Sequence, residues 1–225
     1  ATVTALEERL ATLEDKVVAL ETDNASLQNL ISDVVPYMTG GTDTQGNPTV
    51  FFSGANLHIN NGAGTSRSVN GTGNMIIGYD EARIPNALMK EFCTETDSPI
   101  GTSYATQIDC ESNDGIWGNG SQKIGSHYLI IGSGNSYTQS TGLVVGSNNT
   151  ASAVNSSVLG GFLNLTSGAH SNILGGHQNQ TSGYNSNTVA GIDNLSSGEE
   201  SSITGGRSNI ASGNGSSISG GDSNL

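Results

Sequence analysis

A repeat of 15 residues in the C-terminal half of the chain constrains the fold more than any other feature. A glycine recurs at this step, an asparagine follows it three positions later, and a Ser-Gly pair comes next. The glycines are Gly146, Gly161, Gly176, Gly191, Gly206 and Gly221, the asparagines are Asn149, Asn164, Asn179, Asn194, Asn209 and Asn224, and the pairs begin at Ser167, Ser182, Ser197 and Ser212. A short, constant period is typical of a solenoid, whose units are stable only when they stack.

Two columns of apolar residues follow the same period. The first holds Leu143, Val158, Ile173, Ile203 and Ile218, with Thr188 as its polar member; the second holds Leu165, Leu195, Ile210 and Leu225, with Thr150 and Gln180 as exceptions. A helix would need apolar residues every three or four positions and would not accept so much glycine. Two short strands per period, each with one inward side chain, fit better. We therefore predict a parallel β-solenoid over residues 125–225, with the glycine and asparagine columns at corners of positive φ.

The composition is unusual for a folded protein. Of the 225 residues 32 are glycine, aromatic residues make up 5% and charged residues 12%. Low hydrophobicity and abundant glycine are also found in disordered linkers. A linker has no reason to keep an aliphatic column at a constant step, so we favour the solenoid.

The N-terminal segment follows a heptad pattern instead. Its a positions are Val3, Leu10, Val17, Asn24 and Ile31, and its d positions are Leu6, Leu13, Leu20, Leu27 and Val34. The g positions include Arg9 and Lys16 and the e positions include Glu14 and Glu21, which suits a parallel coiled coil. We predict such a coiled coil over residues 1–35, ended by Pro36, and a neck or linker over 36–49. The heptads alone do not decide between two and three helices.

An insertion separates two similar strands. The strings "NMIIG" (74–78) and "YLIIG" (128–132) are interpreted as equivalent strands of neighbouring coils, where a coil is one turn of the solenoid. Residues 79–124 lie between them and hold both cysteines, the single tryptophan, eight acidic and three basic residues. Solenoids tolerate insertions at their corners. We therefore place the start of the solenoid at residues 50–78 and an independent insertion at 79–124.

Cys93 and Cys110 are the two cysteines of the chain. A zinc site would need more ligands than these residues supply. In an exported chain we expect a disulfide that closes the insertion and contributes about 3 kcal/mol through the entropy of the unfolded state. The alternative is two free, buried thiols in a cytosolic protein.

The insertion also supplies the candidate ligand-binding residues Phe92, Tyr104 and Trp117. Exposed aromatic side chains on a constrained loop are frequent anchors of recognition. The alternative is that these rings form a small core for the loop itself. We predict that residues 79–124 project from the solenoid and carry any receptor- or glycan-binding surface.

No pattern in the sequence points to catalysis, a cofactor or a metal site, and the four histidines are scattered. Asn164, Asn179 and Asn194 lie in glycosylation sequons that recur with the repeat. The net charge of −13, from 7 basic and 20 acidic residues, argues against nucleic acid and anionic membranes as partners. The chain has no apolar run long enough for a transmembrane helix and no signal peptide, so we expect no membrane insertion by this segment.

The strings "SSVLGG", "SNILGG" and "SSITGG", with their asparagine and Ser-Gly corners, resemble the head repeats of YadA-like trimeric autotransporter adhesins. The resemblance covers residues 128–225 and, more loosely, 50–78 through "VFFSGANLHINN" and "GNMIIGYDEAR". It implies left-handed parallel β-rolls packed as a parallel homotrimer, a trimeric coiled-coil stalk, and a place outside the cell or on a bacterial surface. The period is one residue longer than is usual in that family, and here the coiled coil precedes the roll.

These features together predict an extracellular trimeric fibre or adhesin segment that provides reach and attaches to a cell-surface protein or glycan. Because the chain begins within a heptad and ends within a repeat, we expect it to be part of a longer fibre. The main alternative is a structural shaft, such as a tail-fibre spacer of a phage or a contractile injection system, with binding located elsewhere. A weaker alternative is a spike whose insertion carries a catalytic carboxylate pair.

One packing prediction follows from strand alternation. Leu159, Leu174 and Val189 come directly after inward residues, so they point outward. We predict that they pack against neighbouring chains, and that the contact loosens where Thr204 and Ser219 replace them.

Overall fold

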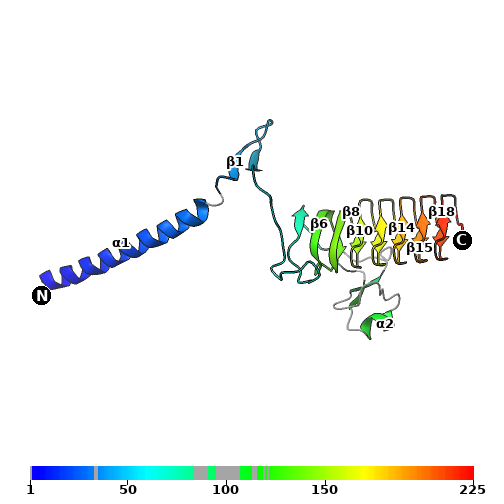
Figure 1. Cartoon of the computed structure of the whole chain (residues 1–225), viewed down its shortest axis with the longest axis horizontal. Helices are drawn as coiled ribbons and strands as arrows, with labels where there is room; N and C mark the ends of the chain where they lie inside the picture. Colours follow the sequence, from blue (N-terminus) through cyan, green and yellow to red (C-terminus); the bar gives the residue numbers. More distant parts are fainter. Residues whose placement is uncertain are drawn as a thin grey trace. The chain divides into compact units, whose positions relative to one another are not determined.

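The structure is a computed structural model (Figure 1), and it describes residues 2–32, 35–83, 91–94, 107–112, 116–118, 120 and 122–225. The chain divides into two compact units, Ala1–His58 and Ile59–Leu225. The first unit contains a helix and a hairpin. The second contains the β-solenoid, here called the roll, and the described parts of the insertion.

The helix α1 runs without a break over Thr2–Ser32. Its heptad positions place the apolar side chains on one row, and in a single chain these side chains are 51–67% exposed. The row consists of Val3, Leu6, Leu10, Leu13, Val17, Leu20, Leu27 and Ile31. The predicted helix is therefore confirmed, whereas its pairing into a coiled coil stays a prediction. Val34 lies outside the described residues.

A hairpin follows the helix, with β1 (Met38–Thr42) antiparallel to β2 (Pro48–Phe52). The carboxylate of Asp43 closes its turn by accepting hydrogen bonds from the backbone N–H groups of Gln45 and Asn47, at 2.9 Å each, and from the Asn47 side chain. The bond from the Asn47 side chain is the main cause that lowers the pKa of Asp43. We assigned residues 50–52 to the start of the solenoid, but they lie in this hairpin, because the tight turn pairs them with residues 38–40 of β1.

The roll consists of two parallel sheets, as predicted. The larger sheet has the order β18-β16-β14-β12-β10-β8-β6-β3 and the smaller one the order β17-β15-β13-β11-β9-β7. The larger contains β3 (Met75–Ile77), β6 (Ser126–Ser133), β8 (Ser140–Ser147), β10 (Ser157–Val158), β12 (Asn172–Ile173), β14 (Asn187–Thr188), β16 (Ser202–Ile203) and β18 (Ser217–Ile218). The smaller contains β7 (Ser136–Tyr137), β9 (Thr150–Ala151), β11 (Leu165–Thr166), β13 (Gln180–Thr181), β15 (Leu195–Ser196) and β17 (Ile210–Ala211). Strand β3 pairs with β6 in the register Met75↔Leu129, which confirms that the two similar strings are neighbouring strands.

The period of the roll changes along its length. Ile130 pairs with Val144 and Val144 with Val158, a step of 14 residues, whereas Val158 pairs with Ile173, a step of 15. The additional residue enters between Val158 and Gly161, because the corner that follows is already in the step of 15, with Ser147 bridged to Phe162. The assignment of Leu143 to the inward column was therefore wrong, since the inward residue of that coil is Val144, which is fully buried.

The interior of the roll is thin. The larger sheet fills it with one buried side chain per coil, and the smaller sheet offers the small side chains of Ala151, Thr166, Thr181, Ser196 and Ala211. The second predicted column was therefore placed on the wrong face. Gln180, Leu195 and Ile210 are only half-buried, whereas the residue after each is buried, and strand alternation turns the two to opposite sides. Leu165, in the same column, is buried on its own side at 3% exposure. A leucine from each side would not fit between sheets this close, so the side opposite isoleucine is small.

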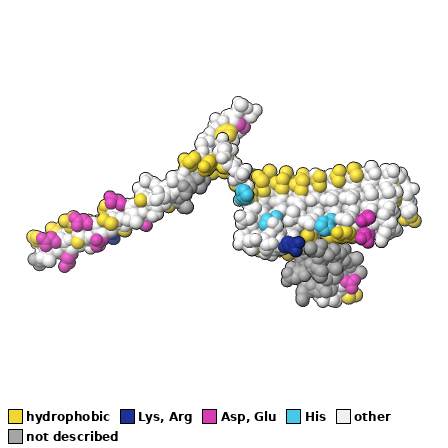
Figure 2. Space-filling view, in the orientation of Figure 1, with side chains coloured by type: hydrophobic (Ala, Val, Ile, Leu, Met, Phe, Trp, Pro, Cys, Tyr) yellow, Lys and Arg dark blue, Asp and Glu magenta, His cyan; other side chains and the backbone are white. Residues whose placement is uncertain are grey.

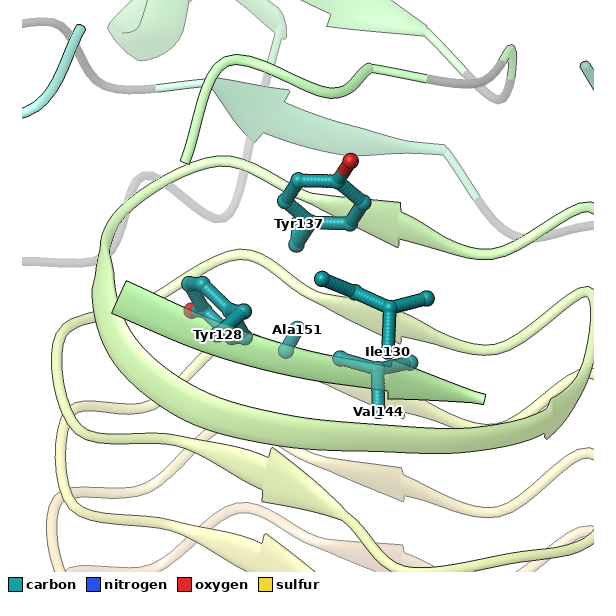
Figure 3. Close-up of a cluster of buried hydrophobic side chains, with 5 residues drawn as sticks. All are labelled: Tyr128, Ile130, Tyr137, Val144 and Ala151. Carbon is teal, nitrogen blue, oxygen red and sulfur yellow. The ribbon is translucent and has the colours of Figure 1, made fainter. Parts of the chain in front are cut away.

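Larger side chains fill the interior at the N-terminal end of the roll (Figure 3), where Tyr128, Ile130, Tyr137, Val144 and Ala151 form a buried cluster. The two tyrosine rings lie 5.5 Å apart between centroids. The ring of Tyr128 occupies the space next to Gly142, where a Cβ atom would lie 2.4 Å from it. Burial raises the pKa of Tyr128 above its ordinary range.

The asparagine column forms a buried ladder and not a row of corners. The backbone N–H of each asparagine donates to the side-chain oxygen of the previous one, as from Asn179 to Asn164 at 3.0 Å. Each side-chain amide donates to carbonyl groups within its own coil and the next, as Asn179 does to Gly175 and Gly191. Our prediction of positive φ was wrong for this column, because the preceding residues make that turn: Asn148, Leu163, Gln178, Asp193, Ser208 and Ser223.

The glycine column does lie at corners of positive φ, as predicted. At Gly161 φ is 86°, and a Cβ atom there would lie 2.2 Å from the carbonyl oxygen of Gly176. A side chain is excluded both by the backbone conformation and by the close approach of the next coil.

Candidate functional site

The described part of the insertion is a small disulfide-linked module. Strand β4 (Phe92–Thr94) pairs antiparallel with β5 (Ile116–Gly118), and the short helix α2 (Gln107–Glu111) packs beside both strands. A disulfide joins Cys93 on β4 to Cys110 on α2, and both side chains are buried. This confirms the predicted disulfide, so the alternative of two free thiols does not apply.

The structure separates the three predicted ligand-binding residues. Phe92 is buried, so this ring follows the alternative in which the aromatic residues form a small core for the loop. Trp117 lies across the strand pair from Cys93, is half-buried, and donates its indole N–H to the Glu91 carboxylate at 2.8 Å. Tyr104 lies outside the described residues. Of the two rings that are described, only Trp117 therefore keeps a face toward solvent.

An ion pair joins the two ends of the insertion. The ammonium group of Lys123 lies 2.9 Å from the Asp80 carboxylate and also donates to the carbonyl groups of Asp80 and Glu81. The hydroxyl of Tyr137 donates to the same carboxylate at 3.2 Å. Burial and the negative charge of Asp80 raise the pKa of Tyr137 above its ordinary range.

Arg83 anchors the first end of the insertion on the roll. Its guanidinium is buried and donates to the carbonyl groups of Gly134 and Asn149, at 3.0 and 2.8 Å, and to the hydroxyl of Thr150 at 2.8 Å. Burial lowers the pKa of Arg83 to about 10. Sequence reasoning counted this residue only as a charge, because its partners lie more than 50 positions away along the chain.

The structure contradicts the use of the three sequons. Asn164, Asn179 and Asn194 are rungs of the buried ladder, and their side-chain amides donate to backbone carbonyls of two coils. An acceptor asparagine must reach a transferase from the surface. These asparagines are therefore closed to glycosylation once the roll has folded.

The outward row of the roll is exposed in a single chain. Leu159, Leu174 and Val189 are 44%, 47% and 38% exposed, and Thr204 and Ser219 follow in the same row. Figure 2 shows hydrophobic side chains in a line along the roll. The outward direction of these residues is confirmed, and their contact with neighbouring chains stays a prediction.

Among the described residues, no group of three or more His, Cys, Asp or Glu side chains is placed to hold a metal ion. In the same part of the chain, no helix combines the length and the apolar character that crossing a membrane requires. Comparison with protein-family models, with curated proteins and with solved structures finds no match to this chain. Its function is therefore argued from its own geometry.

Proposed function

We propose that this chain is a segment of an extracellular trimeric fibre that provides reach and attachment and carries out no catalysis. The observation behind the proposal is that α1 and the roll each present a row of apolar side chains which a single chain leaves in water. Uncovered rows of this kind are typical of interfaces between chains. Other copies of the same chain are the partners proposed here, because their apolar rows have the same spacing along the helix and along the roll.

The row on α1 supports a parallel coiled coil. Its side chains recur at a and d positions over the full helix, and a partner helix would bury each of them. Burying one leucine or valine contributes about 1.5–3 kcal/mol. The basic residues at g and the acidic residues at e then lie near the partner helices in the parallel arrangement.

Three chains, and not two, are proposed because of the resemblance to YadA-like heads. The two coil-to-coil steps that follow the insertion have 14 residues, the period that is usual in those heads. The disulfide of the insertion suits an oxidising environment outside the cytoplasm. These points support a place outside the cell or on a bacterial surface.

The first prediction concerns assembly. In sedimentation equilibrium at micromolar concentration, the chain is expected to have three times the 22.9 kDa mass of one copy. The reason is that the apolar rows of both units lose contact with water only in the assembly. A mass of one or two chains would contradict the trimer.

The second prediction concerns attachment. Residues 89–118 are replaced by a short glycine link, and the trimer is confirmed by its mass. Because the insertion is the irregular and disulfide-closed part of the chain, the shortened protein is expected to lose binding to a panel of animal and bacterial cell surfaces that the full chain binds. An Asp222→Asn variant of the full chain, changed at an exposed carboxylate of the roll, tests whether the loss is specific to the insertion. Unchanged attachment of the shortened protein would remove the insertion as the binding element.

A structural shaft is the second candidate function. The observation that favours it is the continuous hydrogen-bonded stack of the roll, in which every described coil is joined to the next by backbone bonds and by the asparagine ladder. Such a stack forms a long, stiff segment without any ligand. If the full-length trimer binds none of the tested surfaces, this candidate is favoured over attachment.

A further inference from the structure

The Ser-Gly corner of the roll carries an aromatic and acidic surface that no role described above uses. At this corner the backbone passes through positive φ at His170, Asn185 and Glu200, with values of 60°, 53° and 56°. The residue before each of them is hydrogen-bonded to the next coil, as the Tyr184 carbonyl is to the N–H of Glu200 at 2.8 Å. Side chains of successive coils therefore stand next to one another along the corner.

Tyr184 presents an open ring at this corner. The side chain is 39% exposed, and the ring of His170 meets it in an edge-to-face contact with 5.3 Å between centroids. This contact restrains the ring while part of it stays in solvent. The aromatic face carries partial negative charge and attracts weakly positive C–H groups, such as those on one face of a sugar ring.

Two free carboxylates lie one coil beyond the ring. Glu199 and Glu200 are exposed, and within the described part of the chain neither side chain has an ion pair or a hydrogen bond. A carboxylate can accept hydrogen bonds from two neighbouring hydroxyl groups. Asn185 is half-buried and occupies the corner position equivalent to Glu200 in the preceding coil. The amide of Asn187 donates to the Asn185 carbonyl at 3.1 Å, which holds the Asn187 side chain near the corner.

The corner also stays accessible in the proposed trimer, so this step rests on the proposed function. The apolar row begins two residues past Ser157 and Asn172, at Leu159 and Leu174. The outward residues nearest the corner are apolar in the first coils, at Met75, Leu129 and Leu143, and polar from Ser157 onward. Neighbouring chains that cover the apolar row therefore leave the corner of the later coils in water.

We propose that this corner binds a neutral saccharide, with a sugar ring on Tyr184 and its hydroxyl groups on Glu199, Glu200 and Asn185. The unpaired carboxylates and the net charge of −13 disfavour anionic ligands. An exposed ring next to hydroxyl-binding carboxylates and amides matches a ligand with one apolar face and a polar rim. The proposal adds a saccharide site on the roll that is separate from the insertion.

The test measures binding of the full-length trimer to an array of immobilised neutral oligosaccharides ending in glucose, galactose, mannose or N-acetylglucosamine. At least one class is expected to bind, and Tyr184→Ala is expected to weaken that binding at least about tenfold, because the stacking face is lost. Glu199→Gln combined with Glu200→Gln is expected to weaken it by about the same factor. Tyr184→Phe keeps the ring, and Asp222→Asn changes a carboxylate elsewhere on the roll, so both are expected to bind as the unchanged chain does.

Three results would overturn the proposal: no binding to any neutral sugar, binding that survives Tyr184→Ala, or binding of cationic peptides alone. Each protein is also tested for its mass and for attachment to cell surfaces. A Tyr184→Ala trimer that still binds sugars and attaches normally removes this site and leaves the fibre function standing. A chain that binds sugars but does not form a trimer retains the site and contradicts the proposed assembly.

Discussion

Thr188 shows how strictly the interior of the roll selects single residues. It occupies the inward row between Ile173 and Ile203, is fully buried, and its hydroxyl has no hydrogen-bond partner among the described residues. By contrast, the buried hydroxyl of Thr181 on the opposite sheet bonds to Ser171 at 3.2 Å. A buried hydroxyl without a partner costs about 1–3 kcal/mol. The two threonines therefore have opposite effects on stability.

Thr188→Val is expected to raise the free energy of unfolding by about 1 kcal/mol, because valine keeps the shape and removes the unpaired hydroxyl. The measurement is chemical denaturation of the assembled protein. Thr181→Val serves as the matched control and is expected to be neutral or destabilising, since it removes a hydroxyl that has a partner. A loss of stability in Thr188→Val would show that this hydroxyl is satisfied in solution.

At the scale of elements, the asparagine ladder joins the coils where the strands themselves are short. Most strands of the later coils have only two residues, so few ladder bonds of the sheets connect one coil to the next. The buried asparagines add bonds to carbonyls of their own coil and of the next coil, as Asn194 does to Ala190 and Gly206. A buried amide with all its partners provides both stability and a fixed register between coils.

Asn179→Ala is expected to lower the free energy of unfolding by about 2–4 kcal/mol, because it leaves the Gly175 carbonyl and the Asn194 N–H without their partner. It also removes one of the two donors to the Gly191 carbonyl, which keeps its bond from the His177 N–H. Denaturation gives the total effect, and hydrogen exchange of the Asn194 amide gives the local one. Asn187→Ala, which changes an outward asparagine of the next strand, is expected to cost less than about 1 kcal/mol. Equal effects of the two variants would contradict a special role for the ladder.

At the scale of the whole molecule, the question is what covers the apolar rows. The side chains on the inner face of the roll are buried by neighbouring coils of the same chain. The outward row at Leu159, Leu174 and Val189 is left exposed to water in a single chain. The same holds for the heptad row of α1. Exposed apolar rows in both units are consistent with a single oligomer, because association of the chains would bury the row of each unit.

Leu159→Asn combined with Leu174→Asn is expected to weaken association of the chains at least about tenfold, because two apolar contacts per chain are replaced by amides. The dissociation constant is measured by sedimentation in a chain that starts at residue 59, so that the helix does not hold the copies together. Thr204→Asn, in the same row but already polar, is expected to change association little. If the double variant associates as tightly as the unchanged chain, the interface lies on another face.

The sequence by itself determined the features that depend on local periodicity. The repeat predicted a parallel solenoid, the heptads predicted a long helix, the similar strings at 74–78 and 128–132 located the interruption, and the cysteine count predicted the disulfide. Each of these follows from spacing along the chain, because helices and stacked coils place residues at regular intervals.

The tertiary structure decided which of two adjacent residues faces the interior. Val144 replaces Leu143, because one additional residue between Val158 and Gly161 shifts the register of the first coils. Thr181 and Ser196 replace Gln180 and Leu195, because a narrow interior accepts a large side chain from one sheet only. It also decided the partners of Arg83 and the grouping of Tyr184 with Glu199. These contacts join residues that are distant in the sequence or lie in separate coils, so they exist only once the roll has closed.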